Sequence, residues 1–142
     1  MNDSTNKEPM KIGDKMEDGT VYAGISPDTG RAMYAAPADV HFGDARARLS
    51  LGKAKWCAKQ FQLGGKDDFR IPSWRELNEL FKSKDEGALK GTFNTAGKDH
   101  RGSWYTSSST DHVLAVWQQR FSDGAVNNYD KFDVSSVRLV RG

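Results

Sequence analysis

The spacing of apolar residues changes twice along this chain, and these changes limit its fold more than any other feature. Two short apolar runs, 21–25 and 32–35, flank the turn-forming segment 26–30 and predict a β-hairpin. Between residues 50 and 81 apolar side chains recur every three or four positions, which predicts helices. After residue 87 short apolar runs alternate with Gly, Ser, Asp and Asn, which predicts strands. Strands, then two helices, then strands predict a single α+β domain.

The first predicted helix begins after Ser50 and ends before Gly64 and Gly65. Its buried stripe follows the i, i+3, i+4, i+7 pattern and consists of Ala54, Cys57, Ala58 and Phe61. Because Cys57 is the only cysteine, neither an intramolecular disulfide nor a cysteine-based zinc site can form. Packing must therefore stabilise the domain.

The second predicted helix begins at a capping box. Ser73 is placed to cap the helix, and Glu76, three residues later, can return a hydrogen bond to the cap. Pro72 helps to end the preceding extended segment. The apolar face of this helix consists of Leu77, Leu80 and Phe81.

The last third of the chain predicts several short strands. Residues 122–124, which include Gly124, read as a turn between two of them, and residues 127–131 read as a loop that carries Tyr129. The predicted strands are 104–106, 113–117, 119–121, 125–126 and 137–140.

Composition excludes several classes of partner. The 142 residues contain no apolar run near 20 residues, so we expect no membrane insertion. The 21 basic and 19 acidic residues read as interspersed, so nucleic acid is not an expected partner. Residues 1–10 lack the apolar core of a signal peptide, which favours cytoplasmic synthesis, with incorporation into a virion or export by a non-classical route. Residues 1–14 read as a polar arm, and residues 15–142 as the domain.

Four blocks, in order, resemble the DUF1566 family, which is related to the C-terminal domain of a collagen-like adhesin of Legionella. The first, residues 68–77, reads DFRIPSWREL where the family has D-W-R-L-P-T-x-x-E-L. The second, residues 104–109, reads WYTSSS and is close to the family's Y-W-S-S-T/S. The other two are residues 116–124, VWQQRFSDG, and residues 136–141, SVRLVR.

The resemblance implies a C-type-lectin-like fold, with two helices packed on a small twisted sheet and the first and last strands close together. It also implies a binding role without specifying the ligand. Two positions depart from the family pattern. Phe69 replaces the usual tryptophan, and Leu139 stands where many members have cysteine, so a family disulfide is missing.

Aromatic residues of the last third are candidates for a ligand-binding surface, because the C–H faces of sugar rings pack on aromatic planes. The stacking candidates are Trp104, Tyr105, Trp117 and Tyr129. The side chains that could bind the hydroxyl groups are Gln118, Gln119, Arg120 and Asn127. The alternative is that Trp104 and Trp117 belong to the core of the sheet.

The motif blocks also contain residues with a structural interpretation. Arg70, Glu76 and Arg138 are charges inside otherwise apolar motifs, which is typical of an internal ion pair. Pro72, Ser73 and Gly124 have the local roles given above.

No metal or cofactor is expected. Asp123, Asp130 and Asp133 could contribute to a calcium site, but turn formation explains them equally well, and the sugar-binding signatures of calcium-dependent lectins are absent. The histidines, His41, His100 and His112, lack zinc-binding spacing. We therefore expect a protein that is not an enzyme.

Two functions remain open. The first is a receptor- or glycan-binding module for adhesion, on a bacterial surface or a phage particle. The second is a structural virion component, such as a capsid decoration or tail-fibre protein, anchored to neighbouring subunits through residues 1–14. A single shallow site would bind weakly, so we expect a homo-oligomer.

Overall fold

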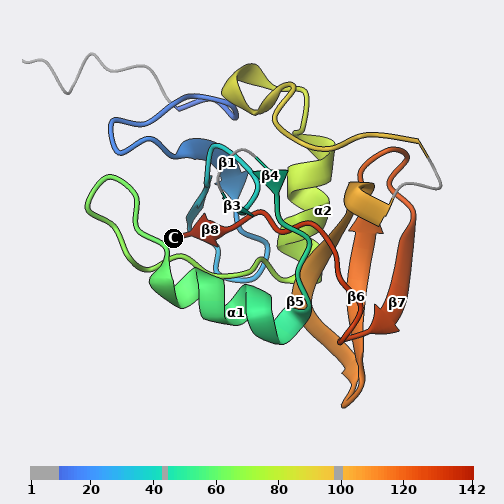
Figure 1. Ribbon diagram of the computed structural model, residues 1–142. Coiled ribbons are helices and arrows are strands. Elements are labelled where there is room, and N and C mark those ends of the chain that lie inside the picture. Colours follow the sequence, from blue (N-terminus) through green and yellow to red (C-terminus); the bar gives the residue numbers. More distant parts are fainter. Residues whose placement is uncertain (1–9, 43–44, 98–100) are drawn as a thin grey trace, which may run out of the picture.

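The computed structural model describes residues 10–42, 45–97 and 101–142. It has the predicted α+β class and is compatible with a C-type-lectin-like fold (Figure 1). Two 3-10 turns, Gly87–Leu89 and Arg101–Ser103, accompany the helices and strands. In chain order the other elements are β1 (Val21–Ile25), β2 (Ala32–Ala35), β3 (His41–Phe42), β4 (Ala45–Arg46), α1 (Leu51–Gln60), α2 (Trp74–Lys82), β5 (Trp104–His112), β6 (Ala115–Arg120), β7 (Val126–Asp130) and β8 (Val140–Arg141).

The strands form separate small sheets rather than the single sheet that the resemblance implied. One sheet has the order β1-β2-β8, a second the order β5-β6-β7, and β3 pairs with β4 alone. In the first sheet, Tyr34 of β2 lies opposite Tyr22 of β1 on one side and Arg141 of β8 on the other. The predicted hairpin therefore forms, and the first and last strands share one sheet.

The β5-β6-β7 sheet differs from the predicted strands at several places. β5 continues beyond the predicted residues 104–106 to His112. Residues 113–114 form the tip of a projecting hairpin, and the runs predicted at 113–117 and 119–121 are replaced by one strand, β6. Residues 127–130, predicted as part of a loop, instead extend the predicted strand at 125–126 into β7, because they pair with β6 as far as Ala115↔Asp130. The predicted turn at 122–124 is present, and Gly124 has φ +84° there.

Both predicted helices form, with different end structures. α1 follows Ser50, whose side chain makes no capping hydrogen bond, and ends at Gln60 before the predicted glycines. α2 has the full capping box: the Glu76 backbone N–H donates to Ser73 Oγ (3.2 Å), and the Ser73 N–H donates to Glu76 Oε1 (2.9 Å). Phe61 lies just beyond α1 and packs edge-on against Phe69.

Each helix lies over its own apolar cluster. The α1 cluster contains the predicted stripe residues Ala54, Cys57 and Ala58, with Phe69 and Ile71 from the segment before α2. The α2 cluster contains Leu77 and Leu80 with aromatic side chains from the last third of the chain. Within the described residues, neither helix has both the length and the apolar character needed to cross a bilayer.

The folded part begins before residue 15. Gly13 donates its N–H to Tyr22 O (2.8 Å), and Ala88 N–H donates to Gly13 O (2.8 Å). A Cβ atom on Gly13 would lie 2.8 Å from the Cα of Gly87, so the two backbones meet where only glycine fits. Residues 11–14 therefore pack on the domain, whereas residues 1–9 of the proposed arm lie outside the described residues.

Candidate functional site

The charged residues of the first motif block form a fixed ion pair at the start of α2. Arg70 Nη1 lies 2.5 Å from Glu76 Oε1, and Arg70 Nη2 donates to Glu76 Oε2 (2.8 Å). Ser26 Oγ also donates to Glu76 Oε2 (2.6 Å). Burial alone would raise the pKa of Glu76, but hydrogen bonds from Arg70, Ser26 and Ser73 outweigh it and lower the pKa to about 2. Glu76 is therefore ionised at neutral pH.

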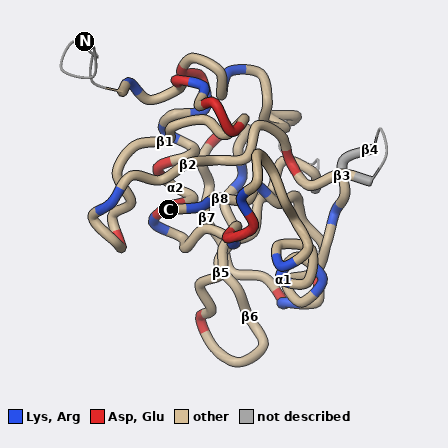
Figure 2. The backbone as a smooth tube through the Cα atoms, turned by 90° about the vertical axis from the view of Figure 1, so that its left-hand side faces the viewer, with Lys and Arg blue, Asp and Glu red and all other residues tan. Residues whose placement is uncertain are grey.

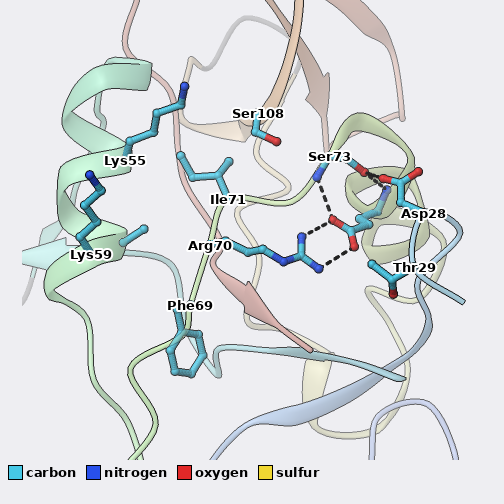
Figure 3. A pocket seen from close by; sticks show the side chains of 11 residues that line it. Asp28, Thr29, Lys55, Lys59, Phe69, Arg70, Ile71, Ser73 and Ser108 are labelled. Atoms are coloured by element: carbon cyan, nitrogen blue, oxygen red, sulfur yellow. Dashed lines mark hydrogen bonds and ion pairs between the residues drawn. The ribbon is translucent and has the colours of Figure 1, made fainter. Parts of the chain in front are cut away.

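A pocket of about 450 Å³ opens between α1 and this ion pair (Figure 3). Its apolar lining consists of Ala58, Phe69 and Ile71, and the Arg70–Glu76 pair forms the wall opposite α1. Ser73 and Asp28 also line this wall and are hydrogen-bonded to each other. Five residues of the first motif block thus line a hollow of the size that ligands occupy, a role that its sequence did not indicate.

Two lysines supply the charge on the α1 side of the pocket. Lys55 and Lys59 are four residues apart, so they lie on one face of α1, and both line the pocket on this side (Figure 3). Within the described residues no carboxylate pairs with either of them. Because Arg70 is paired with Glu76 and both lysines are unpaired, the side of the pocket toward α1 has a net positive charge.

α1 carries several basic residues (blue in Figure 2), and the segments that flank it add more. Residues 47–66 contain five basic and no acidic residues, leaving 16 basic and 19 acidic residues for the rest of the chain. Basic and acidic residues are therefore less evenly interspersed along the chain than we expected from their total numbers. This run was visible in the sequence, but only the fold shows that Lys55 and Lys59 border a pocket.

The predicted aromatic surface does not form, because its residues divide between the two faces of the β5-β6-β7 sheet. Side chains alternate along a strand, and directly paired residues share a face. Trp104 pairs with Arg120, and its ring contacts Tyr129 at 5.0 Å between centroids. Asn127, opposite Gln118, belongs to the same face as Trp104.

The opposite face of the sheet carries Tyr105, Trp117 and Gln119. Tyr105 is fully buried in the α2 cluster, so it belongs to the core, as does the buried Trp104. Trp117 is only half-buried and, with Gln119, lines a groove beneath Trp74 of α2. Trp74, which lies between Ser73 and Glu76 of the capping box, was not among the residues that we predicted for a binding surface.

The other charged candidates have partners within the protein. Arg138 pairs with Asp39 (Nη2–Oδ1 2.8 Å), a residue outside all four motif blocks. Arg120 pairs with Asp123 (2.6 Å), and Asp130 accepts a hydrogen bond from the Phe132 N–H (2.8 Å). Within residues 10–42, 45–97 and 101–142, no three acidic, histidine or cysteine side chains converge as metal ligands; His100 lies outside this part.

Comparison with known proteins supports the resemblance. No curated protein matches the chain. A family model, described as the Lcl C-terminal domain, matches residues 25–141, which include all four motif blocks. The match covers most of the domain, including both helices, the pocket and the groove. The chain therefore belongs to the Lcl C-terminal domain family.

Proposed function

We propose that this domain is a non-catalytic, adhesin-like binding module whose ligand is an acidic glycan held in the pocket beside α1. Family membership supports an adhesin-like role. The observation that carries the choice of ligand is the pair of unpaired lysines, Lys55 and Lys59, along a pocket with an apolar floor.

The lining of the pocket suits a charged sugar better than a simple anion. The faces of Phe69, Ile71 and Ala58 can pack against the C–H groups of a pyranose ring. The hydroxyls of Thr29 and Ser108 also line the pocket and can exchange hydrogen bonds with ring hydroxyls. A carboxylate or sulfate on the ring would then lie toward Lys55 and Lys59.

The Arg70–Glu76 pair contributes shape rather than charge. Both terminal nitrogens of Arg70 are engaged by Glu76, and the Glu76 carboxylate is held on three sides. The wall therefore keeps its position when a ligand enters, which reduces the entropy lost on binding. Affinity at one site would still be modest, so we propose that several copies act together on a repeating polymer.

Binding to polysaccharides of different charge tests the proposal. Three immobilised polymers are compared. Alginate presents carboxylates, dextran sulfate presents sulfates, and neutral dextran has no charged groups. We expect the wild-type domain to bind one or both charged polymers but not dextran, and binding to weaken as salt is raised. The variant Lys55→Glu/Lys59→Glu should bind about tenfold or more weakly, because two attractions become repulsions.

The matched control is Lys11→Glu/Lys90→Glu, which makes the same change in net charge at two exposed lysines outside the pocket. It should retain near wild-type affinity. If both double variants lose affinity equally, binding depends on the net charge of the protein and not on the pocket. If Lys55→Glu/Lys59→Glu binds as tightly as the wild type, the pocket is not the binding site. Binding to dextran as strong as to the charged polymers would reject an acidic ligand.

A further inference from the structure

A second hollow, of about 170 Å³, lies between α2 and the β5-β6-β7 sheet. Trp74 and Asn78 are four residues apart and face it from α2. Trp117 and Gln119 are two residues apart on β6, so both face this hollow from the sheet. Val126 of β7 also lines it and lies opposite Gln119. Two elements that are distant in sequence thus contribute matching pairs, an indole and an amide from each.

The two indoles border this groove without being buried. Trp74 is 47% exposed, although it begins a helix whose other apolar side chains are mostly buried. Trp117 is half-buried on the same groove. By contrast, Trp104 on the other sheet face is buried against Tyr129. Exposed indoles on two sides of one groove offer the flat apolar surfaces on which the C–H faces of a sugar ring pack.

The two amides leave one amide nitrogen and one amide oxygen for a ligand. Gln119 is only 4% exposed. Its Nε2 donates to Asn78 Oδ1 (2.9 Å) and to Gly124 O (3.2 Å), and these hydrogen bonds fix both side chains. Within the described part of the chain, no hydrogen bond engages Gln119 Oε1 or Asn78 Nδ2. Asn78 is half-buried, and the only buried side-chain atoms without a partner in the described residues are Ser122 Oγ and Ser135 Oγ, so Gln119 Oε1 is open to solvent. A neighbouring acceptor and donor match two adjacent hydroxyls of a pyranose.

We propose that this groove binds a neutral pyranose ring, stacked against Trp74 and Trp117 and held through two hydroxyls by Asn78 and Gln119. None of the described residues that line the groove is charged, although the Arg75 guanidinium lies 5.5 Å from the centroid of the Trp74 ring. The chemistry of the groove therefore differs from that of the pocket beside α1. Consecutive residues at the start of α2 take part in the two sites, Ser73 lining the pocket and Trp74 the groove. The inference rests on the proposed carbohydrate ligand and extends it to a chain with both acidic and neutral sugars.

Small neutral glycosides test the groove without involving the lysines. A panel of methyl gluco-, galacto- and mannopyranosides is titrated into the domain, with saturation-transfer NMR and tryptophan fluorescence as readouts. We expect at least one glycoside to bind with a millimolar dissociation constant. Trp74→Ala should weaken this binding about tenfold, because an exposed stacking surface is lost while the core is retained.

Trp56→Ala is the matched control, because Trp56 on α1 is also an exposed indole (56%) and does not line the groove. It should bind the glycoside as the wild type does. An Asn78→Leu variant tests the amide separately and should also lose affinity. If no glycoside binds at tens of millimolar, or if Trp56→Ala and Trp74→Ala lose affinity equally, the groove is not a sugar site. Charged-polymer binding that still depends on Lys55 and Lys59 would leave the proposed function standing.

Discussion

Arg138 and Asp39 form an ion pair in which both side chains are fully buried, although 99 residues separate them in the chain. Tyr105 Oη donates to the second oxygen of Asp39 (2.5 Å), and Arg138 Nη2 donates to Thr92 O (2.5 Å). The guanidinium also lies over the ring of Phe93. Burial, together with the Asp39 carboxylate, raises the pKa of Tyr105 above its usual range, so the phenol remains a donor.

Removing one charge of this pair should be strongly destabilising. Asp39→Asn leaves the Arg138 guanidinium buried without its counter-ion, and we expect a loss of about 3–5 kcal/mol in the free energy of unfolding, measured with urea. Glu79→Gln, which breaks the exposed Glu79–Lys82 pair, should change it by less than about 1 kcal/mol. A similar, small change in both variants would contradict a structural role for the buried pair.

The Glu76 pKa of about 2 predicts a stability difference that depends on pH. The folded state lowers this pKa from 4.5, so the contribution is complete above about pH 4.5 and is lost as pH falls toward 2. At neutral pH it amounts to about 3 kcal/mol. Unfolding curves of wild type and Glu76→Gln should therefore differ most near pH 7 and converge near pH 2; a constant difference would contradict the ion pair.

The contact between Gly13 and Gly87 predicts that an added methyl group is not tolerated there. In Gly87→Ala the new Cβ would lie 2.6 Å from Gly13 O, at a residue whose φ is +48°. We expect a loss of about 1–3 kcal/mol by thermal or urea unfolding. The control is Gly52→Ala in α1, where the Cβ meets no atom within 4 Å and stability should rise by up to about 1 kcal/mol. Equal effects would show that residues 11–14 do not pack as described.

Trp104 and Trp74 should behave oppositely when truncated. Trp104 is 6% exposed and packed against Tyr129 and Arg120, so Trp104→Ala should cost about 3–5 kcal/mol. Trp74→Ala should cost much less, because the ring is 47% exposed. Differential scanning calorimetry of the two variants separates the core tryptophan from the surface tryptophan. A mild effect of Trp104→Ala would restore it as a candidate for the binding face.

Features that depend on neighbouring residues could be predicted from the sequence. Ser73 and Glu76 are three positions apart, so their capping box forms from the local chain and begins α2 at the expected residue. The turn between β1 and β2 likewise follows from Pro27 and Gly30. The order of apolar patterns was enough for the α+β class.

Strand limits were less predictable, because pairing rather than composition decides them. Residues 127–130 contain two asparagines and an aspartate and were predicted as part of a loop, yet they belong to β7 and pair with β6. Once β5 and β6 have their register, alternation places Trp104 and Trp117 on opposite faces. For this reason the predicted aromatic residues do not share one surface.

The sequence by itself determined the class of the fold, the two helices, the first hairpin and the motif blocks of the family. Only the tertiary structure decided that Arg138 pairs with Asp39, that Lys55 and Lys59 border a pocket with Phe69, and that Trp74 meets Trp117 across a groove. The physical reason is distance along the chain. Local hydrogen bonds and periodicity act over a few residues, whereas these contacts join elements whose packing brings together segments from distant parts of the sequence.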